Sequence, residues 1–252
     1  MKKPEVTLRN FEEVYDYYTQ YQQPKMGAYL GHKAMSLAFR PSVKYAKGAE
    51  RKIQDIIDSN GRLVVALNHL SDNDQYVVSA MALREKVFRP IVGNTFIQSK
   101  EILFHHPNKA VRPLLRRGVD VMGAIPAFRK KDVSSENTDL RRQATDRMFE
   151  TSITKINNGQ HMAIFPEGAR NKEQPGIVQE LKPGIAVVLG GIATNLDVGI
   201  VPIGFTYEGK KHNPSMWVEE PLPLQCFEGE SFMTDLRDSL QYSVDRALEN
   251  AQ

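Results

Sequence analysis

Short apolar segments recur along this chain, and polar or charged residues follow each of them. Residues 63–67 form an unbroken apolar run, and residues 161–165 and 198–207 are rich in apolar and β-branched side chains. Apolar runs of this length are typical of strands buried on both faces, which occur in parallel sheets. These segments therefore predict an α/β fold with a mainly parallel sheet.

Helical patterns separate the predicted strands. Apolar residues at three- and four-residue steps predict helices, which cover residues 29–40, 75–83, 138–158 and 233–248. The first of these is amphipathic, and Pro41 interrupts it. Two more apolar segments predict strands at residues 87–92 and 119–124. The alternation implies helices on both faces of the sheet, after an amphipathic helical N-terminal region.

No internal repeat, low-complexity tract or Pro/Gly-rich linker divides the 252 residues. We therefore expect a single domain over residues 1–252, helical over about residues 1–50 and with a motif-bearing α/β core over residues 60–210. The sequence has neither the ~18 consecutive apolar residues of a membrane-spanning helix nor a signal-peptide core. Its single cysteine, Cys226, cannot form an internal disulfide, which suits a reducing compartment. These features predict a cytoplasmic protein.

Charge is unevenly distributed along the chain. The net charge of +3 is too small to indicate nucleic acid as a partner. Between residues 24 and 51, however, a single acid, Glu50, accompanies six basic residues, which are Lys25, Lys33, Arg40, Lys44, Lys47 and Arg51. A basic amphipathic segment fits peripheral binding to the anionic inner face of the cell membrane. A helix packed on the core with a cationic outer face would give the same pattern.

The polar segment after the first apolar run, residues 68–74, reads Asn-His-Leu-Ser-Asp-Asn-Asp. Catalytic groups gather at the carboxyl ends of strands in open α/β sheets, and a loop that turns into a helix can bring His69 beside Asp74. A histidine whose one ring nitrogen is held by a carboxylate is suited to act as a general base. A pair at this spacing also arises by chance, and capping of the strand and helix would explain it without catalysis.

A second polar segment follows the strand predicted at residues 161–165. It contains Glu167, Gly168 and Arg170, which should lie at the same edge of the sheet as His69. The planar guanidinium group of Arg170 suits a phosphate, and Glu167 can accept hydrogen bonds from hydroxyl groups or orient the arginine. A surface Glu-Arg pair in a turn would give the same pattern.

These segments, in this order, resemble the PlsC-type glycerolipid acyltransferase family, which includes 1-acylglycerol-3-phosphate O-acyltransferases. The resemblance covers about residues 63–207. The Asn-His-x-Ser-x-x-Asp motif of the family is matched in full, by Asn68, His69, Ser71 and Asp74. The Phe-Pro-Glu-Gly-Thr-Arg-Ser motif is matched at residues 165–171 apart from Ala169 and Asn171.

The two remaining motifs match less well. The Gly-x-x-Phe-Ile-Asp-Arg motif is matched only at Gly123 and Arg129, and a family lysine that precedes it is matched by Lys100. The Val-Pro-Ile-Val motif is matched at residues 201–204 but ends in Gly204. These departures affect the identity of the substrates more than the chemistry, because the charged motif residues are present.

The resemblance implies direct acyl transfer without an acyl-enzyme intermediate. His69 would take the proton from an acceptor hydroxyl as its oxygen attacks an acyl thioester, and Asp74 would stabilise the imidazolium. The acceptor and its phosphate would be bound by Lys100, Arg129, Glu167, Gly168 and Arg170. The donor would be acyl-CoA or acyl carrier protein, and the acceptor 1-acyl-sn-glycerol 3-phosphate, giving phosphatidic acid. We expect no cofactor and no metal.

Three alternatives stay open at this point. The acceptor could be glycerol 3-phosphate, which the modest mean hydropathy of −0.42 allows. A metal-dependent hydrolase could use His69, Asp72 and Asp74 as ligands, although the cluster contains only one histidine. A membrane-binding module could have kept the fold without activity.

Overall fold

The computed structural model describes residues 3–104, 112–129, 137–208, 213–226 and 230–251. Within these residues the strands are β1 (Ser42–Tyr45), β2 (Arg62–Leu67), β3 (Thr95–Lys100), β4 (Ala124–Ala127), β5 (His161–Ile164), β6 (Val198–Thr206), β7 (Ser215–Val218) and β8 (Leu222–Pro223). The helices are α1 (Phe11–Gln20), α2 (Lys25–Ala38), α3 (Ala49–Asp58), α4 (Asp74–Arg84), α5 (Arg112–Val121), α6 (Thr138–Asn157), α7 (Gly184–Gly190) and α8 (Glu230–Glu249).

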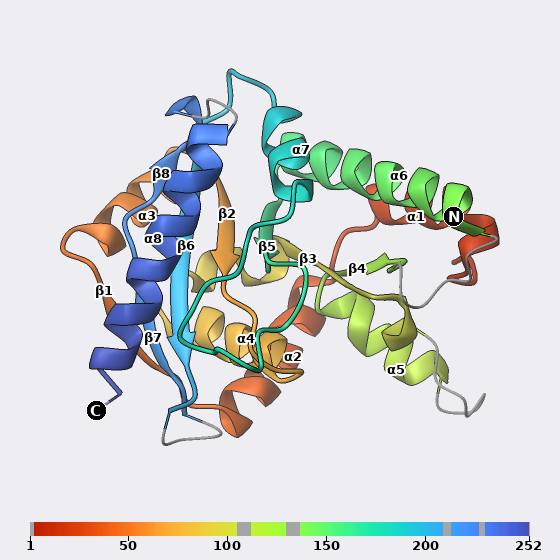
Figure 1. Ribbon diagram of the computed structural model, residues 1–252. Helices are drawn as coiled ribbons and strands as arrows, with labels where there is room; N and C mark the ends of the chain where they lie inside the picture. Colours follow the sequence, from red (N-terminus) through yellow and green to blue (C-terminus); the bar gives the residue numbers. More distant parts are fainter. Residues whose placement is uncertain (1–2, 105–111, 130–136, 209–212, 227–229, 252) are drawn as a thin grey trace.

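All eight described strands belong to one sheet, in the order β1-β7-β6-β2-β5-β3-β4, with β8 paired to β6 (Figure 1). The five strands from β6 to β4 run parallel to one another. Strand β7 is antiparallel to β6 and parallel to β1. The prediction of a mainly parallel sheet is therefore confirmed, and the carboxyl ends of the parallel strands meet at one edge.

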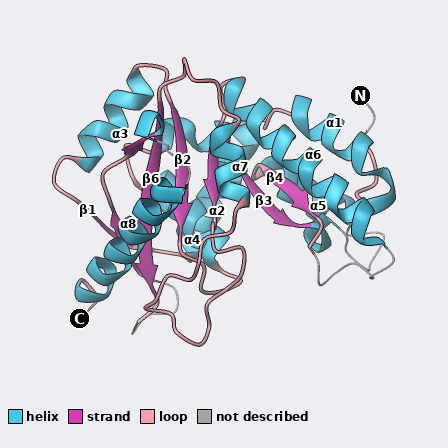
Figure 2. Ribbon diagram, turned by 45° about the horizontal axis from the view of Figure 1, so that its top comes forward, coloured by secondary structure: helices cyan, strands magenta, loops and turns pink. Residues whose placement is uncertain are grey.

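Helices cover both faces of the sheet, as predicted (Figure 2). Alternate side chains of β2 point to opposite faces of the sheet, and helices bury both sets. Val64 and Ala66 belong to a core shared with α1, α6, α7 and α8. Leu63, Val65 and Leu67 belong to a second core shared with α3 and α4. Burial of one such large side chain contributes about 1.5–3 kcal/mol, so an apolar β2 is anchored from both faces.

Gly204 lies where the backbones of β6 and α8 touch. A Cβ atom at this position would be 2.2 Å from the carbonyl carbon of Ser243 and from the backbone nitrogen of Val244. No side chain fits without moving α8. The glycine that departs from the fourth motif of the acyltransferase family therefore reflects the packing of α8 on the sheet.

Two of the predicted strands were wrong. Residues 87–92 form a turn and the start of a 3-10 helix (Arg89–Asn94) with a proline in its first turn, and the strand is β3 instead. Pro90 cannot donate a hydrogen bond to a sheet ladder, and Val87 and Ile91 are buried by packing beneath the sheet. Of residues 119–124, the first three end α5, and β4 begins only at residue 124. A short apolar run does not by itself distinguish a helix end from a strand.

The N-terminal region is helical in α1 and α2, which confirms the amphipathic helix before Pro41. The expected helical stretch of about 50 residues also contains β1, which pairs with β7 at the edge of the sheet. None of the described helices is both long and apolar enough to cross a lipid bilayer.

Candidate active site

The loop between β2 and α4 holds the first motif, and the end of β2 fixes its position. The side-chain amide of Asn68 donates to the carbonyl oxygen of Phe205 over 3.0 Å, and the backbone N–H of Phe205 donates to Asn68 Oδ1 over 2.9 Å. This reciprocal pair ties the end of β2 to the end of β6. The loop therefore leaves the sheet edge in a defined direction.

His69 and Asp74 lie in contact, as the sequence predicted. His69 Nδ1 is 2.7 Å from Asp74 Oδ2, and the imidazole ring stacks on Phe165 with ring centroids 4.4 Å apart. A carboxylate accepts hydrogen bonds only, so it selects the tautomer with the proton on Nδ1 and the lone pair on Nε2. Nε2 forms no hydrogen bond with any described residue, and 19% of the side chain is exposed. The free lone pair is therefore available to a hydroxyl group that enters the site.

Asp74 is fully buried and its carboxylate accepts five hydrogen bonds. Besides His69, the donors are the backbone N–H groups of Leu70 and Ser71, the Ser71 hydroxyl and the Tyr207 hydroxyl, at 2.6–2.8 Å. Asp74 is also the first residue of α4, where the helix dipole favours a negative charge. Donors and dipole together compensate the burial of the carboxylate and hold it beside His69. Ser71 therefore acts locally, through its hydroxyl and its backbone N–H, to hold the Asp74 carboxylate.

Glu167 has an environment that differs from the one we expected. Its carboxylate accepts the backbone N–H of His69 over 2.7 Å and the backbone N–H of Gln179 over 2.9 Å, and only 1% of the residue is exposed. Burial raises the pKa of Glu167, and the two amide bonds oppose this shift. Both oxygen atoms accept hydrogen bonds from the backbone, so Glu167 braces the loop that carries His69.

Gly168 makes the turn that separates Glu167 from Arg170. Its φ angle is +65°, in the left-handed region that favours glycine. Its backbone N–H donates to the carbonyl oxygen of Phe165 over 3.0 Å, which closes the turn after β5. The next contact is at Asn171, whose backbone N–H donates to the carbonyl oxygen of His69 over 2.7 Å. The loops after β2 and β5 are thereby joined, as the shared sheet edge predicted.

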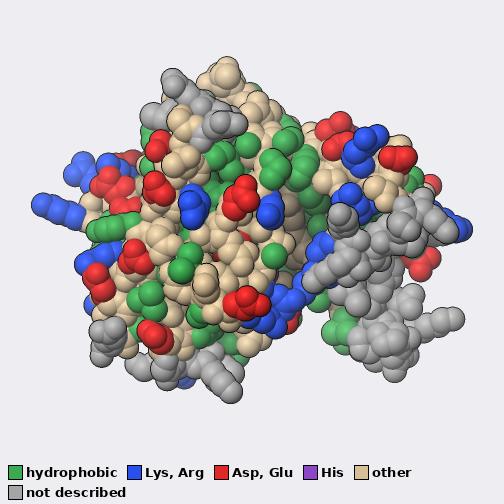
Figure 3. All heavy atoms as spheres, in the orientation of Figure 1, with side chains coloured by type: hydrophobic (Ala, Val, Ile, Leu, Met, Phe, Trp, Pro, Cys, Tyr) green, Lys and Arg blue, Asp and Glu red, His purple; other side chains and the backbone are tan. Residues whose placement is uncertain are grey.

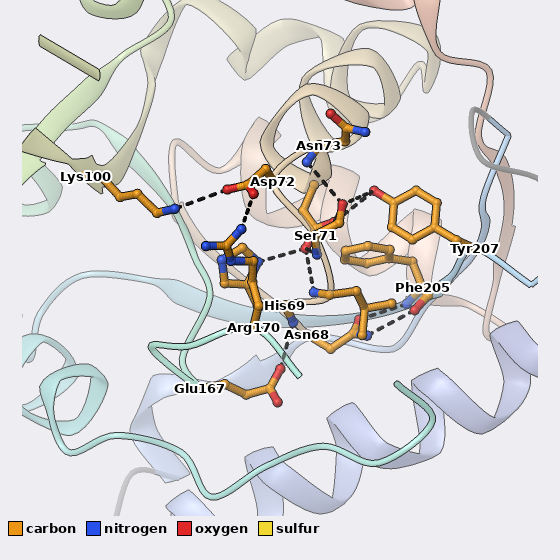
Figure 4. Close-up of polar contacts among 12 residues, drawn as sticks. Asn68, His69, Ser71, Asp72, Asn73, Lys100, Glu167, Arg170, Phe205 and Tyr207 are labelled. Atoms are coloured by element: carbon orange, nitrogen blue, oxygen red, sulfur yellow. Dashed lines mark hydrogen bonds and ion pairs between the residues drawn. The ribbon is translucent and has the colours of Figure 1, made fainter. Parts of the chain in front are cut away.

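Lys100 and Arg170 point toward a third residue, Asp72 (Figure 4). Lys100 Nζ lies 3.1 Å from Asp72 Oδ1, and the guanidinium group of Arg170 forms an ion pair with Asp72 Oδ2. The hydrogen bond from Lys100, helped by Arg170, lowers the pKa of Asp72. Two cations from the ends of β3 and β5 therefore meet beside the loop of His69.

Arg129 lies at the same edge, two residues beyond β4. Residues Lys100 and Ala127 are register partners in the parallel β3–β4 pair, so Arg129 follows β4 at the edge of the sheet where β3 ends. Arg129 is partly buried. Basic side chains gather along the hollow between α8 and α6 on this face of the molecule (Figure 3).

An apolar cavity of about 650 Å³ opens beside the site. Its walls come from α2, α4, α5, β3 and the 3-10 helix before β3. Gln75 and Ser99 line the part at the carboxyl edge of the sheet, where α4 begins and β3 ends. Leu30 and Leu114, which are 59% and 72% exposed, line the part that reaches the surface. The cavity therefore extends from the carboxyl edge of the sheet to the outside.

The sequence identified Asp72 only as a possible metal ligand and did not identify Tyr207 as a site residue. Asp72 occupies a position that the family motif leaves variable, so the motif carried no signal for its pairing with Lys100 and Arg170. Tyr207 directly follows β6, and its position at the carboxyl end of a strand was the signal that could have identified it as a site residue. Burial and the nearby Asp74 raise the pKa of Tyr207, which keeps its hydroxyl protonated as a donor to Asp74.

No group of three or more His, Cys, Asp or Glu side chains among the described residues is arranged to hold a metal ion. The three residues considered as metal ligands have other partners. Asp74 receives five donors, whereas Asp72 pairs with Lys100 and Arg170.

Comparison with known proteins bears on the family. A family model described as Acyltransferase matches residues 48–206. A search of curated proteins found no match. The matched region begins just before α3 and ends with β6, so it contains the loops after β2 and β5 as well as Lys100, Arg129 and Arg170.

Proposed function

This chain belongs to the PlsC-like acyltransferase family, and from that premise we propose that it transfers a fatty acyl group from an acyl thioester to a glycerol phosphate acceptor. The acceptor we propose is 1-acyl-sn-glycerol 3-phosphate, and the product is phosphatidic acid. The observation that carries the proposal is the His69–Asp74 pair, with Nε2 of His69 free, beside Lys100 and Arg170.

His69 acts as the general base. Nε2 takes the proton of the acceptor hydroxyl while the hydroxyl oxygen attacks the thioester carbonyl carbon. As the tetrahedral intermediate collapses, the carbon–sulfur bond breaks, and His69 returns this proton to the leaving thiolate. Asp74 stabilises the imidazolium, as its contact with Nδ1 allows. General-base catalysis supplies about 10²–10⁴-fold, so alignment of the two substrates supplies much of the remaining acceleration.

Lys100 and Arg170 hold the acceptor phosphate, and Arg129 contributes from the neighbouring strand end. An arginine can bind two phosphate oxygens at once, and a lysine adds a compact charge. Glu167 and Gly168 act indirectly, because the first braces His69 and the second turns the chain toward Arg170.

The apolar cavity holds the acyl chain of the donor. Apolar walls suit a hydrocarbon, and burial of each CH₂ group contributes about 0.8 kcal/mol. Coenzyme A and acyl carrier protein both present such a chain as a thioester, so the donor is one of these two. No cofactor or metal enters the proposed reaction.

The protein works peripherally at the anionic inner face of the cell membrane. Exposed apolar side chains on α2 and α5 form the docking surface, which consists of Met26, Tyr29, Leu30, Leu37, Leu114 and Leu115. The exposed bases Lys25, Lys33 and Arg117 accompany them, which matches anionic lipid. Leu30 and Leu114 also line the cavity, so a chain can pass between the bilayer and the cavity.

Replacement of His69 by alanine tests the mechanism. We expect thiol release from an acyl thioester to fall by at least 10²-fold, with the thermal unfolding and liposome binding of the wild type. Unchanged turnover in a folded variant would exclude His69 as the base.

A matrix of two donors and two acceptors tests the substrates. Acyl-CoA and acyl carrier protein are each combined with 1-acyl-sn-glycerol 3-phosphate and glycerol 3-phosphate, and the acylated position of each product is determined. We expect the lysolipid to be preferred, and a preference for glycerol 3-phosphate would replace the proposed acceptor.

Arg170→Ala should lower kcat/KM for the phosphorylated acceptor. Arg142→Ala is the control, because Arg142 is an exposed arginine of α6, and it should leave kcat/KM unchanged. An equal loss with a phosphate-free monoacylglycerol would contradict the role of Arg170.

Liposome sedimentation tests the docking surface. Met26→Glu combined with Leu37→Glu should reduce binding to anionic vesicles, because neither residue lines the cavity and both are exposed. Tyr242→Glu on α8 is the matched control, since Tyr242 is also an exposed apolar residue. Equal binding by all three proteins would place the membrane contact elsewhere.

A further inference from the structure

Asp72 lies between two cations that the proposed reaction needs for the acceptor phosphate. Each of its carboxylate oxygens pairs with a different one, Oδ1 with Lys100 and Oδ2 with Arg170. The side chain of Asp72 is 70% exposed, whereas those of Lys100 and Arg170 are 27% and 17% exposed. The cations are thus held by the protein, and the carboxylate reaches them from the solvent side.

A phosphate group is chemically suited to replace this carboxylate. It offers three oxygen acceptors and a charge of about −1.5 to −2 at neutral pH, against two oxygens and one charge for an aspartate. Lys100 and Arg170 lie close enough to hold the two oxygens of one carboxylate, so one phosphate can span them as well. The pKa of Asp72 is lowered by the same two cations, which keeps the carboxylate ionised and paired.

The Asp72 carboxylate is free to leave. Its hydrogen bonds and ion pairs within the described part of the chain are those with Lys100 and Arg170. Its neighbours in the loop are held independently, because Ser71 and Asp74 bond to each other. Rotation of the Asp72 side chain toward water therefore leaves His69 and Asp74 in place.

We propose that Asp72 occupies the position of the acceptor phosphate in the free enzyme and competes with it for Lys100 and Arg170. This inference rests on the proposed function. The competition sets a threshold: a dianionic phosphate displaces the carboxylate, while a weaker anion, with a single charge, does not. Asp72 thereby contributes to the choice of acceptor without touching the reacting atoms.

The expected size of the effect follows from partly exposed ion pairs. Such pairs are individually weak, so loss of two of them as competitors should strengthen phosphate binding by roughly two- to thirtyfold. Asp72→Asn removes the charge and keeps the size of the side chain. Glu173→Gln is the matched control, because Glu173 is an exposed acid three residues after Arg170. This variant measures how much the loss of any nearby negative charge changes phosphate binding.

Two measurements on the full chain test the inference. Titration calorimetry with inorganic phosphate gives Kd without turnover, and steady-state kinetics give KM for 1-acyl-sn-glycerol 3-phosphate and for a monoacylglycerol. We expect Asp72→Asn to lower the phosphate Kd and the KM of the phosphorylated acceptor by roughly two- to thirtyfold. The monoacylglycerol KM, and the same constants in Glu173→Gln, should not change in this way.

The opposite results would overturn the inference. A phosphate Kd that is unchanged or higher in Asp72→Asn would show that the carboxylate organises the cations instead of competing, and an equal decrease in Glu173→Gln would reduce the effect to general charge. A wild type that fails to distinguish phosphorylated from phosphate-free acceptors would refute the proposed function, whereas the calorimetric comparison would still decide the role of Asp72.

Discussion

Glu167 provides a sharp test of how the site is assembled. Its two carboxylate oxygens accept the backbone N–H groups of His69 and Gln179, and 1% of the residue is exposed. Glu167→Gln keeps the shape of the side chain but replaces one acceptor oxygen with an NH₂ donor. Each of the two oxygens now accepts a backbone N–H, so in either orientation the NH₂ group must face one of these donors.

The cost of this change can be worked out from the contacts. A buried donor left without an acceptor costs about 1–3 kcal/mol, and charged hydrogen bonds are worth more than neutral ones. We therefore expect the free energy of unfolding to fall by about 2–3 kcal/mol. In a protein of this size each kcal/mol corresponds to roughly 2–4 °C in Tm, so Tm should fall by about 4–12 °C.

The functional effect should follow from displacement of His69. The backbone of His69 is bound directly to Glu167, so kcat should fall by a similar factor for phosphorylated and phosphate-free acceptors. Calorimetric unfolding and steady-state kinetics measure the two effects, and Glu180→Gln, in an exposed acid of the same segment, is the control. A normal Tm with a raised KM for the phosphorylated acceptor alone would refute this reasoning and return Glu167 to the substrate-binding group.

Four further predictions concern the pair, the packing, the pH dependence and the cavity. The Asp74 carboxylate accepts hydrogen bonds from five donors, and Asp74→Asn would place an NH₂ donor among them. We expect kcat to fall by about 10²–10⁴-fold in steady-state assays. A smaller loss would show that other groups orient His69. Gly204→Ala should lower the free energy of unfolding by about 1–3 kcal/mol, because the new Cβ would lie 2.2 Å from the α8 backbone. An unchanged Tm would mean that α8 can move away. Burial and the charge of Arg62 lower the pKa of His161 from 6.5 to about 4. The neutral side chain therefore contributes its full stability above pH 6.5, and about 2 kcal/mol of this is lost at pH 5. Urea unfolding at pH 7.5 and pH 5 should show the loss, and His161→Gln should lack it. Ala82→Phe should fill part of the cavity and shift the preference toward shorter acyl thioesters in competition assays, which an unchanged chain-length profile would contradict.

Local sequence was sufficient to predict the His69–Asp74 contact. Residues 68–74 run from a strand into a helix start, and this short loop brings the two side chains together. Contacts from Glu167 and Tyr207, which are distant in sequence, then hold the loop in place. The same holds for α6 and α8, whose apolar periodicity is long enough to be unambiguous. Local sequence failed at residues 87–92, where Pro90 and burial beneath the sheet outweighed an apolar composition.

Contacts between distant segments decided the rest of the site. Glu167 was predicted to bind the acceptor or to orient Arg170, yet its carboxylate accepts the backbone N–H of His69, 98 positions away. Asp72 was considered only as a possible metal ligand, yet two cations from other strand ends converge on it.

The sequence by itself determined the family, the parallel α/β core and the His69–Asp74 pair, because each depends on short-range patterns of burial and hydrogen bonding. Only the tertiary structure decided which charges face the solvent and which face the backbone. A carboxylate can bind a substrate, a cation or a backbone amide equally well, and its choice depends on neighbours brought by the fold. For Glu167 those neighbours are two amides, and for Asp72 they are Lys100 and Arg170.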